Sequence, residues 1–166
     1  MKSNLFALAA LVALFVSPIL HAEDAAVPSQ DELESRFKAA MTAVTMSGRW
    51  SPVKDGVMGA EKEDKYSIVS VEKVSGSSWV INARMKHGGQ EAVIPIPVQV
   101  KWAGDTAMII VDKLKLPGGN AYEGSAYSAR VLVHNGTYAG TWSGGDHGGL
   151  LNGIITKDES AKPADK

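Results

Sequence analysis

Apolar and polar residues alternate along most of this chain, and the clearest alternation predicts a hairpin over residues 129–142. Asn135-Gly136 separates two alternating runs, and this dipeptide favours a type I′ turn because both central residues need positive φ. A two-residue loop fixes the register, so Val133 is expected to face Tyr138 on a mostly apolar side. The pattern therefore predicts one buried and one solvent-facing side.

Similar alternation predicts eight strands in all. Their expected ranges are 48–50, 66–74, 78–86, 92–102, 106–114, a strand ending at 134, a strand ending near 142, and 150–156. Residues 51–64 and 143–149 are rich in glycine or charge and are expected to be loops, and another loop begins at 117–120. Pro95 and Pro97 remove two amides from one edge of their strand, so that edge cannot form a regular ladder.

A single helix is predicted before the strands. Ser29-Gln30-Asp31-Glu32 fits a capping box, in which the serine and glutamate side chains satisfy free backbone amides. An apolar stripe follows at helical spacing: Leu33, Phe37, Ala40, Met41 and Val44. An amphipathic stripe of this length needs a packing partner, so the helix is expected to lie against the strands.

These elements predict an all-β fold, an antiparallel eight-stranded up-and-down barrel with one N-terminal helix, with a β-sandwich as the alternative. In a meander, successive turns alternate between the two ends of the sheet. The connections at 75–76, 103–105 and 135–136 share one end and are tight. The other end has longer, glycine-rich connections, where backbone can approach a ligand. The helix enters at the tight end and is expected to plug it.

The first residues have the pattern of a signal peptide. Lys2 precedes a short apolar run over residues 5–19, and Ala22 offers a small residue for cleavage. The run is too short and too closely followed by Glu23-Asp24 for a membrane span. We therefore expect a signal peptide over 1–22, a linker over 23–28, one domain over 29–157 and a flexible tail over 158–166.

Composition narrows the compartment and the partners. The chain has no cysteine, which excludes disulfides, thiolate metal sites and a cysteine nucleophile. An exported domain without disulfides favours a bacterial periplasmic or secreted protein. The net charge of −1, with both signs mixed, shows no basic patch for nucleic acid. The sequence leaves the oligomeric state open.

Candidate site residues fall at the glycine-rich end. His87, Asp146 and His147 lie on its predicted connections and could serve as metal ligands or as an acid–base pair, although turn chemistry alone explains them. His134 belongs to the opposite end, about 20 Å away along its strand, and cannot join them. Four tryptophans could line an aromatic ligand cavity or fill the core: Trp50, Trp79, Trp102 and Trp142. Of these, Trp79 and Trp142 are included in the predicted ligand site.

A helix followed by Gly48-Arg49-Trp50 at the first of eight meandering strands resembles the calycin superfamily, especially the lipocalins. The resemblance implies a ligand-carrying barrel with Trp50 packed at the closed end. The chain departs from the family pattern at the turn of residues 134–138 and at Lys157, where the family usually has arginine.

Three functions remain after these steps. The first is an exported, non-enzymatic protein that binds a small apolar or amphipathic ligand at the glycine-rich end. The second is a structural or cell-envelope interaction protein with a filled core. The third is a hydrolase or metal-dependent enzyme, which ranks lowest because no nucleophile elbow, phosphate loop or metal signature is present. No cofactor is indicated.

Overall fold

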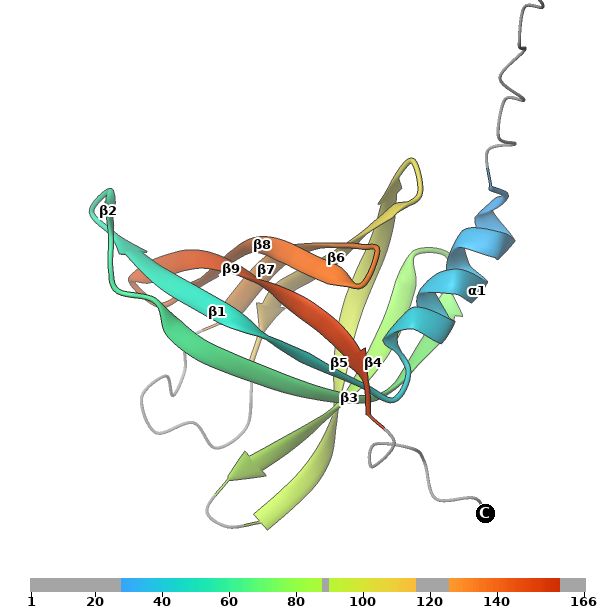
Figure 1. The fold of residues 1–166 in the computed structure, drawn as a ribbon, viewed down its shortest axis with the longest axis horizontal. Helices are drawn as coiled ribbons and strands as arrows, with labels where there is room; N and C mark the ends of the chain where they lie inside the picture. Colours follow the sequence, from blue (N-terminus) through green and yellow to red (C-terminus); the bar gives the residue numbers. More distant parts are fainter. Residues whose placement is uncertain (1–27, 88–89, 116–125, 159–166) are drawn as a thin grey trace, which may run out of the picture.

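The computed structural model describes residues 28–87, 90–115 and 126–158. The elements in these residues are α1 (Gln30–Met41), β1 (Val44–Lys54), β2 (Val57–Met58), β3 (Lys62–Ser75), β4 (Ser78–His87), β5 (Gln90–Ala103), β6 (Thr106–Leu114), β7 (Tyr127–His134), β8 (Thr137–Gly144) and β9 (His147–Lys157). Apart from the short β2, each strand pairs antiparallel with the next, and β9 returns to pair with β1 (Figure 1). The predicted eight-stranded antiparallel barrel with an N-terminal helix is confirmed, with β2 as an addition.

The predicted hairpin joins β7 to β8. Val133 lies opposite Tyr138 in the ladder, as the two-residue loop requires. Asn135 and Gly136 have φ values of 45° and 71°, which is the positive-φ pair of a type I′ turn. Gly76 and Gly104 also have positive φ, so glycine serves all three tight turns.

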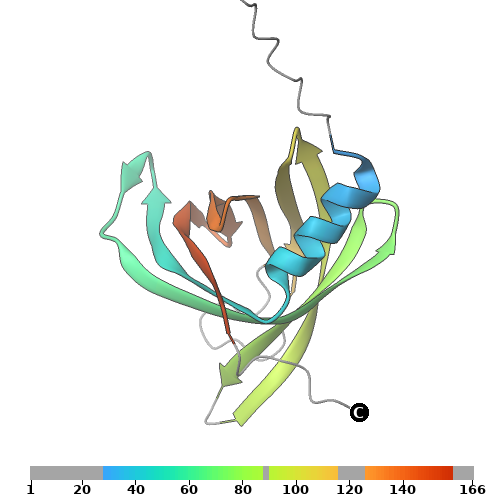
Figure 2. The ribbon, with the colours of Figure 1, turned by 45° about the vertical axis from the view of Figure 1, so that its right-hand side comes forward.

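The helix α1 closes the end of the barrel that carries these three turns. Its first turn has the predicted capping box, formed by Ser29 and Glu32. Phe37 is buried and packs edge-on against Trp79 and Trp102, with ring centroids 5.4 and 6.0 Å away. Figure 2 shows α1 beside the β3–β4 and β5–β6 turns. The expected plug is therefore present, and aromatic packing holds it.

Two predicted loops are wrong. Within 51–64, β1 continues to Lys54, a tight Asp55-Gly56 turn follows, and β2 pairs back on β1. Within 143–149, β8 and β9 pair up to Gly144 and His147, and only residues 145–146 form the turn. The glycines there are strand residues that leave room for aromatic rings: a Cβ on Gly149 would stand 2.6 Å from the Trp142 indole nitrogen.

The hairpin of β4 and β5 projects from the barrel wall (Figures 1 and 2). The ladder of β3 with β4 reaches only the Ser67–Arg84 pair, and the ladder of β5 with β6 begins at Gln99. Pro95 and Pro97 lie just beyond that point, so the predicted break in pairing is confirmed. The wall of the barrel is therefore incomplete on both sides of this hairpin.

Several predictions fall on residues that the structure does not describe. The signal peptide and most of the linker lie within 1–27, and the loop predicted from residue 117 lies within 116–125. The predicted tail begins at Asp158, which is described: its carboxylate accepts a hydrogen bond from the Thr45 hydroxyl at 2.9 Å. Residues 159–166 are outside the described part of the chain.

Candidate ligand cavity

The interior of the barrel holds a cavity of about 450 Å³ on the side away from α1. Every strand of the closed barrel contributes to its wall, and α1 contributes nothing. The wall is mainly apolar, and much of it comes from the inward-facing branched residues Ile68, Ile81, Ile96, Val98, Ile109, Val111, Val131 and Leu151. The alternation along each strand points these side chains inward, so the sequence pattern itself produces an apolar lumen.

One carboxylate lies in this apolar wall. Asp64 of β3 lines the cavity together with Tyr66 and Tyr138. The Tyr66 hydroxyl donates a hydrogen bond to Asp64 Oδ2, and the Lys65 backbone N–H donates to Asp64 Oδ1 at 2.9 Å. Burial, followed by the hydrogen bond to Asp64, raises the pKa of Tyr66. Burial, followed by the charge of Asp64, also raises the pKa of Tyr138. Both tyrosines therefore stay protonated at neutral pH.

Glycines bring Tyr138 close to Asp64. A Cβ on Gly48 would stand 2.4 Å from the Tyr138 hydroxyl, and a Cβ on Gly153 would stand 2.7 Å from its ring. The ring of Tyr138 therefore lies over two glycines of β1 and β9. Gly48 is the ladder partner of Asp64, so the hydroxyl of Tyr138 and the carboxylate of Asp64 border the same point of the wall.

Aromatic residues form a row at the cavity end farthest from α1. The rings of Trp50 and Trp142 meet edge to face at 5.4 Å, and His147 meets Trp142 in the same way at 5.3 Å. The Lys62 ammonium lies 4.9 Å from the centre of the Trp50 ring, within cation–π range. Trp50 thus lies far from α1, which differs from the closed-end position that the lipocalin resemblance implies. The reason is that β1 begins at Val44 rather than at Gly48, which moves Trp50 along the strand.

The predicted rim pair is also at this end. Asp146 accepts hydrogen bonds from the Lys54 ammonium and interacts with His147 Nδ1, each at 2.9 Å. The hydrogen bond from Lys54, and then the one with His147, lowers the pKa of Asp146 to about 2. Because Asp146 is exposed, this pair fixes the β8–β9 turn in solvent rather than in a closed pocket.

The structure brings together three of the five predicted site residues. Asp146, His147 and Trp142 are neighbours, and Trp142 lines the cavity. Trp79 is buried at the α1 end and is not part of the cavity wall. The side chain of His87 lies outside what the structure describes, so its role stays a prediction. Within the described residues, no group of three or more histidine, aspartate or glutamate side chains could hold a metal ion.

His134 lies at the opposite end, as expected. Its Nδ1 is 3.6 Å from the Asp105 carboxylate, in a groove of about 400 Å³ beside α1. Sequence reasoning did not single out Asp64, Tyr66 or Tyr138 as site residues. The alternation of its hairpin predicts an inward-facing Tyr138, whereas Asp64 lies in a charged stretch that predicts a loop.

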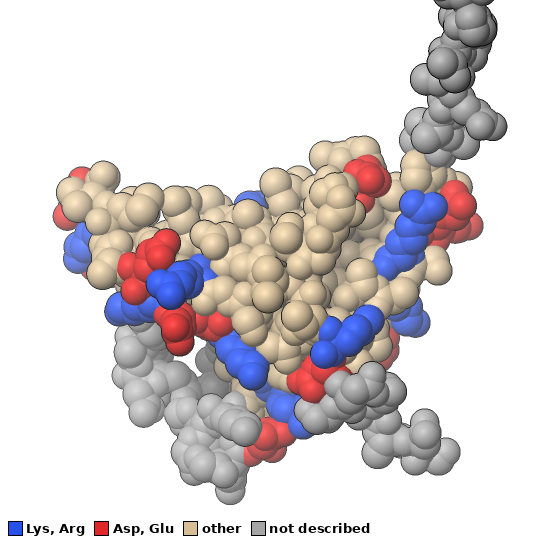
Figure 3. All heavy atoms as spheres, viewed as in Figure 1, with Lys and Arg blue, Asp and Glu red and all other residues tan. Residues whose placement is uncertain are grey.

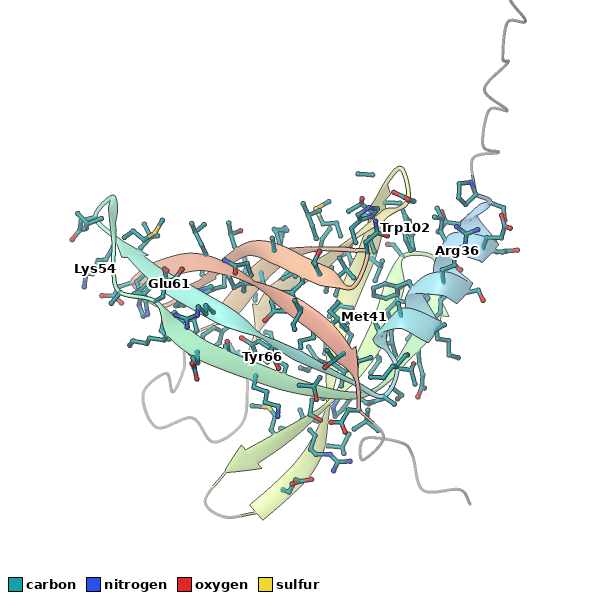
Figure 4. The ribbon with its side chains drawn as sticks, in the orientation of Figure 1. Arg36, Met41, Lys54, Glu61, Tyr66 and Trp102 are labelled. Carbon is teal, nitrogen blue, oxygen red and sulfur yellow. The ribbon has the colours of Figure 1, made fainter. Side chains whose placement is uncertain are left out.

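Figure 4 shows Tyr66 on β3, well separated from Trp102 beside α1. Tyr66 is 41% exposed although it faces inward, because it borders both the cavity and the gap beside the β4–β5 hairpin. Tyr66 therefore lies in both the cavity wall and the gap where β3 has lost its β4 partner.

Comparison with protein-family models, with characterised proteins and with solved structures finds no match to this chain. Among the described residues, no helix is both long and apolar enough to cross a membrane.

Proposed function

We propose that this chain is an exported, non-enzymatic binding protein that holds a small apolar or amphipathic ligand inside its barrel. The cavity of about 450 Å³ is the observation that carries the proposal, since small-molecule sites are concave, mostly apolar and of about 300–1,000 Å³. Export rests on the signal-peptide pattern of residues 1–22.

The contrast between the filled α1 end of the barrel and its hollow opposite end supports the same function. The plug of α1 fills one end of the barrel, where Phe37, Met41 and Trp79 are buried outside the cavity wall. At the other end, Trp50 and Trp142 offer aromatic faces, and Asp64 and Tyr138 offer polar groups that can orient a ligand. A few polar groups in an apolar wall are typical of sites that bind and orient small molecules.

Binding of the neutral fluorophore N-phenyl-1-naphthylamine tests this function. We expect its emission to rise on titration with the protein, with a stoichiometry near one. Ala129→Phe places a ring in the cavity and should abolish the signal, because Ala129 lines the wall beside its ladder partner Trp142. Leu132→Phe, on the outer face of the same strand, is the control and should bind normally.

Failure of the unmodified protein to bind the fluorophore would favour the structural or envelope-interaction function. Equal binding by Ala129→Phe would place the fluorophore outside the cavity and refute the proposed site.

A further inference from the structure

We propose that the ligand is an amphipathic amine, whose protonated N–H group binds between Asp64 and Tyr138 while its apolar body fills the cavity. This inference rests on the proposed function, because it names the ligand class of the same cavity. It is carried by a carboxylate with no cationic partner among the described residues, a tyrosine hydroxyl and two tryptophan rings, which all line one cavity.

The carboxylate of Asp64 has no cation as a partner in the described part of the chain: it accepts hydrogen bonds from the Lys65 backbone N–H and from the hydroxyl of Tyr66. Lys62 lies on the same face of β3, but its ammonium is over the ring of Trp50. Lys65 is exposed and belongs to the other face, since it is the ladder partner of Ser47 rather than of Gly48. Asp64 is half-buried in the cavity wall, and a counter-charge beside it would be attracted to its carboxylate. A cationic ligand supplies that counter-charge.

The hydroxyl of Tyr138 provides the second polar contact. The residue is only 3% exposed, and it lines the cavity. A tyrosine hydroxyl on a cavity wall can both donate and accept a hydrogen bond, so it can bind a polar ligand atom. Its oxygen can accept a bond from a ligand N–H, and Asp64 on the other side of Gly48 can accept a second. A primary or secondary ammonium matches two acceptors, whereas a quaternary ammonium has no N–H to donate.

Aromatic side chains complete the recognition of a cation. Trp50 and Trp142 lie in the same cavity wall as Asp64, and their faces attract positive charge. The position of the Lys62 ammonium shows that the Trp50 ring already attracts a cation in this structure. An anionic ligand would instead meet the like charge of Asp64.

Four probes of equal chain length test the ligand class: octylamine, octanol, octanoate and octyltrimethylammonium. Their affinities are measured at neutral pH by calorimetry and by displacement of N-phenyl-1-naphthylamine. We expect octylamine to bind roughly tenfold or more tightly than octanol, because hydrogen bonds to charged groups are stronger than neutral ones. Octanoate and octyltrimethylammonium should both bind more weakly than octylamine.

Two isosteric variants assign the effect. Asp64→Asn should reduce the affinity for octylamine to that for octanol while leaving octanol and the neutral fluorophore unaffected. Tyr138→Phe should weaken octylamine roughly two- to tenfold through the lost hydrogen bond. Glu63→Gln is the matched control: it removes the same charge from the adjacent, outward-facing residue, which contacts Arg49 at 4.0 Å. Figure 3 shows charges of both signs gathered on this outer side of the barrel.

The outcomes separate the two proposals. If the fluorophore binds but octylamine shows no advantage, or keeps its advantage in Asp64→Asn, the amine inference is wrong and the binding function stands. If octyltrimethylammonium binds as tightly as octylamine, the proposed hydrogen bonds from the ligand N–H group to Asp64 and Tyr138 are refuted. If neither the fluorophore nor any octyl probe binds, the proposed function itself fails.

Discussion

Replacing Phe37 by alanine should strongly destabilise the barrel, because this ring is the centre of the plug at the α1 end. Phe37 is 4% exposed and contacts two indole rings at 5.4 and 6.0 Å. Removing a buried phenylalanine costs about 3–5 kcal/mol, which includes the cavity that remains. With a urea m-value of about 2 kcal/mol/M, the unfolding midpoint should fall by roughly 1.5–2.5 M.

Urea unfolding followed by circular dichroism and tryptophan fluorescence measures this loss. Phe37→Leu keeps most of the volume and should lose less, which keeps the test valid if the alanine variant fails to fold. Ser35→Ala, on the exposed side of the same helix, should change stability by no more than about 0.5 kcal/mol. An unchanged midpoint for Phe37→Ala with full helix content would show that α1 does not pack on Trp79 and Trp102.

Three further predictions concern turns and titrations. Gly136→Val should cost roughly 1–3 kcal/mol in thermal melts, because φ there is 71°, and an unchanged melting curve would contradict the type I′ turn. Lys54→Met should raise the pKa of Asp146 from about 2 towards its usual value in a carbon-detected NMR titration, and no change would contradict the ion pair. Because the folded pKa is lowered, the stabilisation by Asp146 is present above about pH 4 and is lost as the pH falls towards 2. Tyr66 and Tyr138 have raised pKa values, so their stabilisation is present below about pH 10 and is lost as the pH rises further. An ultraviolet titration of the folded protein should show both ionising above pH 10, and normal titration would contradict the effect of Asp64 on these two tyrosines.

Local chemistry explains why much of the fold could be predicted. Asn135-Gly136 specifies one turn geometry and therefore one register, so the pairing of Val133 with Tyr138 needed no tertiary information. Pro95 and Pro97 lack amide hydrogens, so their effect on the ladder follows from covalent structure alone. Short connections between alternating strands then left closure into a barrel as an economical way to remove the sheet edges.

The misplaced loops have a common physical cause. Asp55-Gly56 is the same kind of hairpin signal as Asn135-Gly136. The residues on either side of it do not alternate, so the sequence predicts one long loop there instead of two paired strands. Gly148 and Gly149 predict a loop because glycine usually interrupts strands. Their reason is tertiary: Gly149 lies under the ring of Trp142, and only the packed structure reveals that contact.

The polar part of the cavity could not be found from the sequence for a related reason. Inward positions are identified by apolar character, and Lys62 and Asp64 are inward-facing residues that break this rule. Their stretch reads as charged and exposed, which is typical of a loop or an outer face. Residues that violate the burial pattern of their own strand are expected at functional sites, and here they can be recognised only once the register is known.

The two ends of the barrel make stability and binding separable. Phe37 and its indole neighbours do not line the cavity, although one core cluster joins Phe37 to cavity residues such as Tyr138. Asp64 makes its described bonds within three consecutive residues of β3, so its replacement by asparagine leaves the long-range packing intact. A substitution in the plug should lower stability, and it should change the apparent affinity only by raising the unfolded fraction. Asp64→Asn should instead alter ligand preference in a barrel that unfolds at a nearly unchanged midpoint. If the ligand site itself stabilised the fold, changes in stability and in ligand preference would occur together. Because Phe37 lies outside the cavity wall that contains Asp64, we expect the surrounding packing, and not the ligand, to maintain the apolar cavity.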